Sequence, residues 1–336
     1  MKNRHQVKTF MVVFLLLILQ ITILSIPCWA SEPINPARPK IQKLGTIDID
    51  LVETTPIVFE GKLYRFEYVR RNYWANRTGD SYFRFIDHQT GQATPSFAKG
   101  YHLGSAFVDN SKVYVSCVPI WDAPDIELFI SSDLSTWEHH TIIKRPGFGI
   151  FNTSICKTDK DYVLMYEIGK PPAYSGHRFT ALFARSKDML HWELLPPECN
   201  YSKDRYTAPH CLRYLDGWFY DFYLEAHEGY ETRVVRSKDF INWQVSPLNP
   251  VLRFSAEDKK IANEALTSQQ REKIAQAKNI NNSDIDFCEY QDRLIINYSW
   301  GNQQGVEFLA EAVYQGHQDA FLKSWFPDQA PSANGL

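Results

Sequence analysis

The sequence predicts an all-β fold, a five-bladed β-propeller, on three observations. First, the motif Ser-x-Asp-x-x-x-Trp occurs three times, at residues 131–137, 186–192 and 237–243. Second, its aspartates are 55 and 51 residues apart, and a repeat of that length is typical of propellers and other repeat folds. Third, each motif follows an apolar, strand-like run. A chain of 336 residues is long enough for five such units around one axis.

Each predicted blade begins with a hairpin, because turn-forming residues such as Glu60-Gly61 and Asp216-Gly217 separate two β-rich runs. The five inner hairpins are expected at 54–68, 104–117, 152–166, 207–224 and 284–298. Third strands are expected at 81–86, 127–130, 180–184, 232–235 and 306–310, and the motif tryptophans begin the outer strands. We interpret the motif aspartate as structural, because a Ser/Asp turn that binds its own backbone needs no catalytic role.

One segment departs from the strand pattern. Residues 255–278 are rich in helix formers and show no strand alternation. Ser255 and Thr267 resemble N-caps, and Gln270 completes a capping box with Thr267. The sequence therefore predicts two short helices inserted between blades four and five. We expect the propeller to span residues 31–327 and the tail at 328–336 to be disordered.

The first 30 residues have the features of a signal peptide. Lys2, Arg4 and Lys8 precede an apolar run at 10–26, and Ala30 offers a small residue for cleavage. This predicts a secreted or periplasmic protein with no membrane association after cleavage. The alternative is an uncleaved N-terminal anchor, since the apolar run approaches the length that spans a bilayer.

Charge and cysteine content exclude several classes of protein. The formal net charge of −3, without a long basic run, gives no indication of a nucleic-acid partner. Five cysteines remain after cleavage, and this odd number argues against a complete disulfide framework. The aromatic content of 14% suits both β-strands and sugar-binding surfaces. The oligomeric state is left open.

The repeats, together with Thr207-Ala208-Pro209-His210 and the hairpin at 216–220, resemble the five-bladed propeller glycosidases, which include arabinanases, xylosidases and invertases. Glycoside hydrolase family 43 is the nearest named group. The resemblance covers roughly residues 53–327 and implies a propeller with a carbohydrate site on its axis. The chain departs from the family at all three catalytic acid positions, where Thr55, Thr153 and Thr207 stand. Any catalytic carboxylates must therefore come from other positions.

Propeller topology limits where those carboxylates can be. The start of each inner strand and the end of the following strand lie on one face, beside the axis. Glycoside hydrolysis needs two carboxyl groups, one protonated and one ionised. We predict Glu225 as the general acid, because it follows the apolar run 219–224, and Asp284 as the general base. Glu53 is the rival base, and Glu167 is expected to tune or orient the others.

Other residues on this face are predicted to bind substrate. Arg70 and Arg71 are adjacent cations suited to an acidic sugar, and His210 is interpreted either as a ligand or as a hydrogen-bonded core residue. The predicted set is Arg70, Arg71, Trp74, Trp121, Asp122, Asn152, Arg205, His210, His227, Asp286, Trp300 and Asn302. No cofactor is predicted with certainty. Asp284 and Asp286 share one strand face, which suits calcium near the axis as well as catalysis.

Three functions fit this sequence. The first is a secreted glycosidase that acts on a plant or algal polysaccharide fragment. The second is a propeller that binds carbohydrate without cleaving it, which the three threonines support. The third is a glycoside phosphorylase or transferase, which predicted export disfavours. In each case the expected partner is a carbohydrate.

Overall fold

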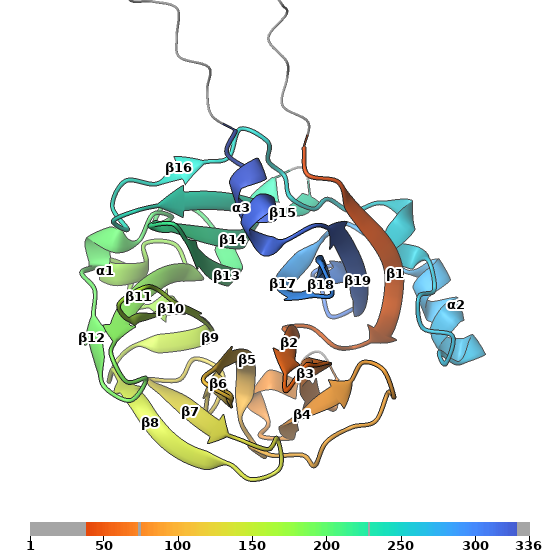
Figure 1. Cartoon of the computed structure of the whole chain (residues 1–336), viewed down its shortest axis with the longest axis horizontal. Helices are drawn as coiled ribbons and strands as arrows, with labels where there is room; N and C mark the ends of the chain where they lie inside the picture. The colour runs from red at the N-terminus through yellow and green to blue at the C-terminus, as the bar shows by residue number, and fades with distance from the viewer. Residues whose placement is uncertain (1–37, 73–74, 228, 328–336) are drawn as a thin grey trace, which may run out of the picture. The chain divides into compact units, whose positions relative to one another are not determined.

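The computed structural model describes residues 38–72, 75–227 and 229–327, which form a ring of five β-sheets (Figure 1). From inner to outer strand, blade one is β2 (Thr55–Phe59), β3 (Lys62–Arg70) and β4 (Ser81–Asp87); blade two is β5 (His102–Asp109), β6 (Lys112–Val118), β7 (Asp125–Ser131) and β8 (Glu138–Lys144); blade three is β9 (Gly149–Lys157), β10 (Tyr162–Lys170), β11 (Thr180–Ser186) and β12 (Trp192–Leu194); blade four is β13 (Thr207–Leu215), β14 (Trp218–His227), β15 (Gly229–Ser237) and β16 (Gln244–Val245); and blade five is β17 (Ser283–Tyr290), β18 (Arg293–Gly301), β19 (Glu307–Gln315) and β1 (Ile41–Ile49). The innermost strands contact one another in a closed cycle, from β2 through β5, β9, β13 and β17 back to β2. The predicted five-bladed β-propeller is confirmed.

The ring is closed by a strand that the sequence did not reveal. β1, near the N-terminal end of the described residues, pairs antiparallel with β19 and supplies the outer strand of blade five. Trp300 on β18 reinforces this junction, because its indole Nε1 donates a hydrogen bond of 2.9 Å to Thr46 Oγ1 on β1. The first and last strands thus share one sheet, which removes two exposed strand edges.

The three Ser-x-Asp-x-x-x-Trp motifs form the same turn, as expected. Asp133 Oδ1 accepts hydrogen bonds from the backbone amides of Ser135 and Thr136, at 2.7 and 2.8 Å. Asp188 and Asp239 accept the equivalent pairs of amides. The serine hydroxyl in turn accepts the amide two residues later. The aspartates therefore serve the turns and lie on loops at the outer part of the blades.

The motif tryptophans pack blades against one another. Trp137 of blade two stacks on Phe97, with ring centroids 3.8 Å apart and planes 6° apart. Trp243 of blade four stacks in the same way on Phe183 of blade three, at 5.8 Å. The repeat thus encodes the contact between neighbouring blades, because each of these tryptophans covers an aromatic residue that precedes its own blade.

The predicted helical insertion is present between blades four and five. It contains a 3-10 turn at Ala256–Lys259 and the helix α2 at Ser268–Gln276. Both begin with a capping box, formed by Ser255 with Asp258 and by Thr267 with Gln270. The remaining short helices are α1 (Pro172–Ser175), α3 (Gln318–Ser324) and 3-10 turns at Ala75–Arg77 and Pro197–Cys199.

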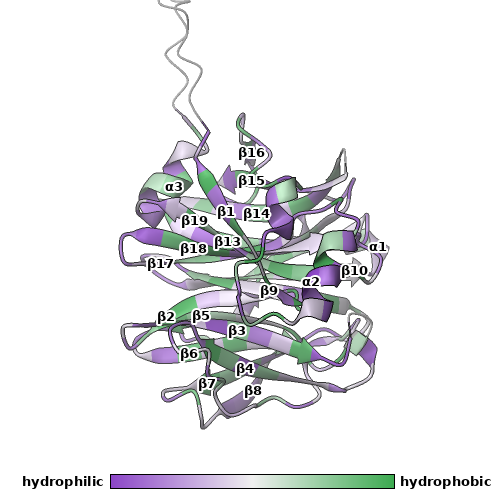
Figure 2. Ribbon diagram, turned by 90° about the vertical axis from the view of Figure 1, so that its right-hand side faces the viewer, coloured by the Kyte–Doolittle hydropathy of each residue, from purple (hydrophilic) through white to green (hydrophobic). Residues whose placement is uncertain are grey.

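Hydrophobic residues run along the strands, and the connecting loops are mostly hydrophilic (Figure 2). All five cysteines of the described residues are free, and four of them are buried. No helix among the described residues is long and apolar enough to cross a membrane. The predicted signal peptide at 1–30 and the predicted disordered tail at 328–336 lie outside the described residues.

Candidate active site

A cavity of about 110 Å³ lies where the inner strands begin, at one end of the propeller axis. Residues from all five blades line it. They are Val52, Glu53, Arg70, Trp121, Phe151, Asn152, Glu167, Phe179, Tyr206, Ala208, Pro209, Leu224, Ser283, Asp284, Gln303 and Glu307. We call this space the acid cavity, because four of its lining residues carry carboxyl groups. A smaller space of about 30 Å³ continues from it along the axis and shares Glu53, Asn152, Pro209 and Asp284 with it.

The four carboxyl groups come from three blades. Glu53 precedes β2 of blade one, Glu167 lies on β10 of blade three, and Asp284 and Glu307 lie on β17 and β19 of blade five. Glu167 is fully buried, Glu307 is 2% exposed, and the Glu53 side chain is 15% exposed. Arg70 at the end of β3 approaches Glu53, with 3.5 Å between Nη1 and Oε2.

Burial raises the pKa of all four carboxyl groups, because a charged carboxylate loses its hydration there. The pKa of Glu53 and of Glu307 rises to about 8 and that of Glu167 to about 7. The negative charge of Asp284 adds to the rise at each of these three groups. Burial also raises the pKa of Asp284, while a hydrogen bond from the Ser283 hydroxyl opposes the rise. Hydrogen bonds from Ser283 and Ser299 and the charge of Arg70 therefore favour the ionised form of Asp284, while the pKa of the other three groups lies at about 7 to 8.

Glu167 differs from its neighbours because a buried cation lies close to it. His210 lies on β13, and both it and Asp221 have fully buried side chains with 3.0 Å between Nδ1 and Oδ2. The other ring nitrogen bonds to the backbone oxygen of Thr207. Burial lowers the pKa of His210, but Asp221 helps to raise it by more, so the ring is held in its charged form with both nitrogens donating. That charge limits the rise in the pKa of Glu167.

One carboxyl oxygen of Glu167 has a hydrogen-bond partner among the described residues, and the other has none. Asn152 Nδ2 donates a hydrogen bond of 3.1 Å to Oε2. Oε1 is buried and has no hydrogen-bond partner among the described residues. A buried polar atom of this kind normally has a partner, so the cavity presents a group that is ready to bond to a ligand.

An aromatic wall faces the carboxyl groups of blades five and one. Trp121 after β6 packs on Phe151, with ring centroids 4.7 Å apart, and on Phe179 at 5.9 Å. Phe179 in turn contacts Tyr206 at 5.7 Å, and Leu224 completes the wall. Blades two, three and four therefore supply the apolar side of the acid cavity. This division suits a sugar ring, which has an apolar face and a polar rim.

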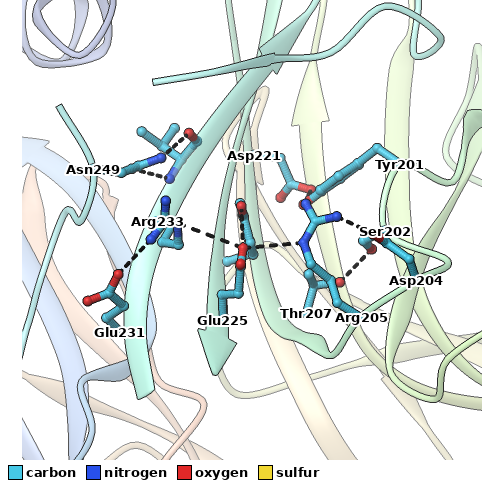
Figure 3. A network of polar contacts seen from close by, with 12 residues as sticks. Tyr201, Ser202, Asp204, Arg205, Thr207, Asp221, Glu225, Glu231, Arg233 and Asn249 are labelled. Atoms are coloured by element: carbon cyan, nitrogen blue, oxygen red, sulfur yellow. Dashed lines mark hydrogen bonds and ion pairs between the residues drawn. The ribbon is translucent and has the colours of Figure 1, made fainter. Parts of the chain in front are cut away.

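Glu225, the predicted general acid, occupies a different environment. It lies between Arg205 and Arg233, with 3.3 Å from Arg205 Nε and 3.8 Å from Arg233 Nε to its Oε2 (Figure 3). The Tyr223 hydroxyl donates a further hydrogen bond of 2.9 Å to the same oxygen. Arg233 continues to Glu231 at 2.6 Å, and Glu231 to Arg253 at 2.8 Å. We call the row Arg205, Glu225, Arg233, Glu231 and Arg253 the blade-four ladder. Two guanidinium groups and the Tyr223 hydroxyl thus face the Glu225 carboxyl group, which is not among the residues that line the acid cavity.

The three threonines at the positions of the family's acids are buried and bonded. Thr55 Oγ1 accepts from the Ala106 amide at 3.3 Å, which links blades one and two. The Thr153 hydroxyl lies 2.7 Å from that of Ser116 on blade two, and the Thr207 hydroxyl lies 2.6 Å from that of Ser202. Each of these neutral hydroxyl groups therefore already has a hydrogen-bond partner within the protein.

The other predicted binding residues divide into three groups. Trp121, Asn152 and Arg70 line the acid cavity, and His210 and Asp286 line the smaller axial space. Within the described residues, the lining of the acid cavity does not include Arg71, Asp122, Arg205, Trp300 or Asn302. Trp74 and the side chain of His227 lie outside what the structure describes.

Several of these differences have a direct physical reason. Trp300 is fully buried and stacks on Phe308 at 4.4 Å, so it is a core residue of blade five and a sugar cannot reach it. Arg71 is exposed and pairs with Asp80 at 3.7 Å, whereas Arg70 is buried beside Glu53, so the two cations do not act as a pair. Asp122 pairs with Lys170 at 2.7 Å, and Asp286 pairs with Arg213. Asn302 accepts the amides of Gln304 and Val306 in its own turn.

The prediction of calcium gains no support from the side chains. Among the described residues, no group of three or more His, Cys, Asp or Glu side chains is placed to hold a metal ion. Asp286 faces Arg213, and His210 faces Asp221, so two of the axial groups already have partners.

Sequence reasoning missed Glu307. Carboxyl groups were expected on this face only at the starts of inner strands and the ends of second strands, but Glu307 begins the third strand β19. In the structure Glu307 pairs with Gly301 at the end of β18, which brings it to the same face. The available signal was a glutamate that opens the apolar run Phe308-Leu309-Ala310 in the predicted third strand of blade five.

Comparisons with known proteins show the fold. No family model matches the sequence, and no curated protein matches it. The solved BT0996 RGII complex matches with a TM-score of 0.54 and 12% identity, over 81% of this protein and 92% of that one. The α-L-arabinofuranosidase PaAbf62A from Podospora anserina, solved with cellotriose, matches with a TM-score of 0.55 and 8% identity, over 82% of this protein and 98% of that one.

A third match is the xylan β-1,4-xylosidase from Bacillus halodurans C-125, with a TM-score of 0.51 and 11% identity. The match covers 82% of this protein and 54% of the length of that enzyme. The protein thus resembles five-bladed propeller glycoside hydrolases in fold, at low sequence identity.

Proposed function

We propose that the protein is an exported glycoside hydrolase that cleaves an oligosaccharide or polysaccharide of plant or algal origin. The observation that carries the proposal is the acid cavity, in which Asp284 of blade five and Glu167 of blade three line one space with different hydrogen-bond partners. Blade four separates these two blades on one side of the ring, and blades one and two separate them on the other. Two carboxyl groups on either side of a sugar are what glycoside hydrolysis requires.

The environments assign a role to each group. Glu167 retains its proton up to about pH 7, and its open Oε1 donates that proton to the glycosidic oxygen as the bond to the anomeric carbon breaks. We assign the ionised role to Asp284, because hydrogen bonds from Ser283 and Ser299 and the charge of Arg70 oppose the rise in its pKa. In that role it either removes a proton from the attacking water or attacks the anomeric carbon itself. Asn152 orients Glu167 through the other oxygen. Glu225 does not line the cavity and is not part of this pair.

The backbone fixes the position of two carboxyl groups of the acid cavity. Asp284 and Glu53 have φ values of 52° and 54°, in the left-handed region that non-glycine residues seldom adopt. Such a conformation costs on the order of 1–3 kcal/mol. The buried Leu103 at the start of β5 shares it, with φ of 55°, so it belongs to the way these inner strands begin. Asp284 and Glu53 both stand at the start of an inner strand and carry a carboxyl group of the acid cavity.

The test is a panel of aryl glycosides and oligosaccharides with the wild-type protein, Glu167→Gln and Asp284→Asn. We expect at least one substrate to be hydrolysed by the wild type and turnover of oligosaccharides to be lost in both variants, while sugar binding persists. Aryl glycosides with a good leaving group need no protonation, so Glu167→Gln should retain more activity on them than on oligosaccharides. Oligosaccharide turnover that survives both substitutions would contradict the assignment.

The second candidate is a propeller that binds carbohydrate without cleaving it. The threonines at positions 55, 153 and 207 favour it, because all three expected acids of the resembling family are absent there. Binding across the panel without any turnover would support this function. In either case a sugar is the ligand, and export rests on the predicted signal peptide, which detection of the cleaved protein outside the cytoplasm would test.

A further inference from the structure

The acid cavity contains two carboxyl groups that hydrolysis does not use. Glu167 and Asp284 supply the proton donor and the base, which leaves Glu53 and Glu307. Both are costly to keep, because an ionised carboxylate in a buried cavity must be paired or must take up a proton. Their presence therefore calls for a role in ligand recognition.

The partners of these two groups do not supply a full positive charge to each. Glu307 accepts a hydrogen bond of 3.1 Å from the Asn281 side chain and one of 2.7 Å from the Gln303 amide, both of which are neutral donors. Glu53 faces Arg70, but at 3.5 Å, which is long for an ion pair with a direct hydrogen bond. Among the described residues, Glu307 thus accepts hydrogen bonds from neutral donors, and Glu53 forms a long ion pair with Arg70.

The charges that face the cavity are unbalanced toward negative. The charged residues that line it are Glu53, Arg70, Glu167, Asp284 and Glu307. Outside the lining, His210 pairs with Asp221, and Arg77 and Arg178 lie over the rings of Trp121 and Phe179, at 5.4 and 5.1 Å. Among the described residues of the lining itself, Arg70 is thus the cation that faces four carboxyl groups. With a neutral ligand bound, the negative charge of the carboxylates can be removed only by protonation. A cationic ligand would compensate that charge directly.

We propose that the sugar bound in the acid cavity carries a primary ammonium group, so that the substrate is a glycoside of an unacetylated amino sugar. Glu307 and Glu53 receive the ammonium beside Asp284, and the wall of Trp121, Phe151, Phe179 and Tyr206 receives the apolar face of the ring. The inference rests on the proposed function for the identity of the ligand as a sugar. It adds the charge of that sugar, which the fold and the comparisons do not specify.

Two observations beyond the acidic residues support a ligand at this place. Glu167 Oε1 is buried within the cavity lining and has no hydrogen-bond partner among the described residues. The acidic groups also stand opposite a continuous aromatic wall instead of open solvent. An ammonium on a ring fits that division, because the charge and the apolar face occupy opposite sides of one small molecule.

The test compares matched sugars by calorimetry at neutral pH. The probes are glucosamine and galactosamine, their neutral parents glucose and galactose, and the N-acetylated forms, which keep the substituent but lose the charge. We expect at least one amino sugar to bind about tenfold tighter than its parent, as one charge-assisted hydrogen bond would give. Binding should also release protons, seen as a heat that depends on the ionisation enthalpy of the buffer.

Variants show whether the preference comes from this cavity. Glu307→Gln and Glu53→Gln should each reduce the preference for the amino sugar, with folding checked by thermal unfolding. Glu127→Gln is the matched control, because Glu127 is a buried glutamate of blade two that bonds to His139 at 2.8 Å outside the cavity. A preference lost in the first two variants and kept in the third supports the proposal.

Other outcomes separate this inference from the proposed function. Equal affinity for amino and neutral sugars, absence of binding included, overturns the inference. So does a preference that survives both cavity variants. Hydrolysis of neutral glycosides without any amino-sugar preference would leave the proposed function intact and overturn the inference alone. Preferential binding of an amino sugar without turnover of any glycoside would support the inference and contradict the proposed hydrolase function.

Discussion

Two groups of carboxyl side chains in this propeller, both largely shielded from solvent, have different partners. The acid cavity holds Glu53, Glu167, Asp284 and Glu307 with Arg70 as a lining cation. The blade-four ladder holds Glu225 and Glu231 among Arg205, Arg233 and Arg253. In the ladder each carboxylate has two guanidinium partners, whereas in the cavity lining the carboxyl groups outnumber the cations. The ladder pairs each carboxylate with cations, whereas burial raises the pKa of the carboxyl groups in the cavity.

The comparison shows that the position of a carboxylate on its strand does not determine its chemistry. Glu167 and Glu225 both lie near the end of the second strand of their blades, on the same face of the ring. Glu225 meets two arginines and Tyr223, and Glu167 meets Asn152 and a cavity. Partners supplied by neighbouring strands and loops therefore decide which of the two can serve as an acid.

The blade-four ladder has a consequence for the cavity. Arg205, which Glu225 holds, immediately precedes Tyr206 of the aromatic wall. We therefore assign Glu225 as a positioning residue that fixes the segment carrying Tyr206. Its contribution should appear in substrate binding more than in the chemical step.

The largest expected effect is a difference in kcat/KM between a variant of the acid cavity and a variant of the blade-four ladder. Glu167→Gln should lower kcat/KM on an oligosaccharide by about 10²–10⁴-fold, the usual contribution of a general acid. Glu225→Gln should lower it by less than about tenfold, mainly through KM, since its ion pairs only position Tyr206. The measurement is steady-state kinetics on one substrate with both variants. A larger loss of kcat in Glu225→Gln than in Glu167→Gln would reverse the assignment.

The next effect concerns stability. Glu231→Ala should destabilise the fold by about 2–3 kcal/mol, because it removes the carboxylate partner of Arg253 and leaves Arg233 only the more distant Glu225. Glu307→Gln should cost less at neutral pH or even stabilise the fold, because it removes a buried acid with neutral partners. Urea unfolding of the two variants at pH 7 checks this. Equal losses would show that the two regions are not electrostatically distinct.

The pH dependence of stability sharpens the same contrast. The pKa of Glu307 is about 8 in the folded protein against an ordinary value of 4.5, so the folded state binds this proton more tightly. Its contribution is fully present below about pH 4.5 and is lost as the pH rises toward 8. Glu307→Gln should therefore flatten the decline of stability over this range by up to about 1.4 kcal/mol per pH unit. Parallel curves for variant and wild type would contradict the raised pKa.

The smallest expected effect tests whether the charge of His210 lowers the pKa of Glu167. His210→Gln removes the positive charge that stabilises the Glu167 carboxylate, so the pKa of Glu167 should rise further. Because Glu167 must be protonated to act, the alkaline limb of the kcat/KM profile should move to higher pH, by about one unit or less. A limb that stays in place or moves to lower pH would exclude this influence of His210.

Much of the fold followed from local patterns in the sequence. The Ser-x-Asp-x-x-x-Trp turns, the five inner hairpins and the capped insertion are formed by residues close together in the sequence, and short-range hydrogen bonds specify them. The sequence also placed Glu53, Glu167 and Asp284 on the correct face, because propeller topology brings equivalent strand ends together.

Three features depended on contacts between distant residues, and the sequence by itself did not determine them. β1 joins β19 across most of the sequence, Trp300 lies in the core bonded to β1, and Glu307 enters the cavity through the register of β19 on β18. The ionisation of each carboxyl group likewise depends on contacts between residues that are distant in the sequence. It depends on burial and on charges from other blades, so only the tertiary structure could distinguish Glu225, held between arginines, from the carboxyl groups whose pKa burial raises.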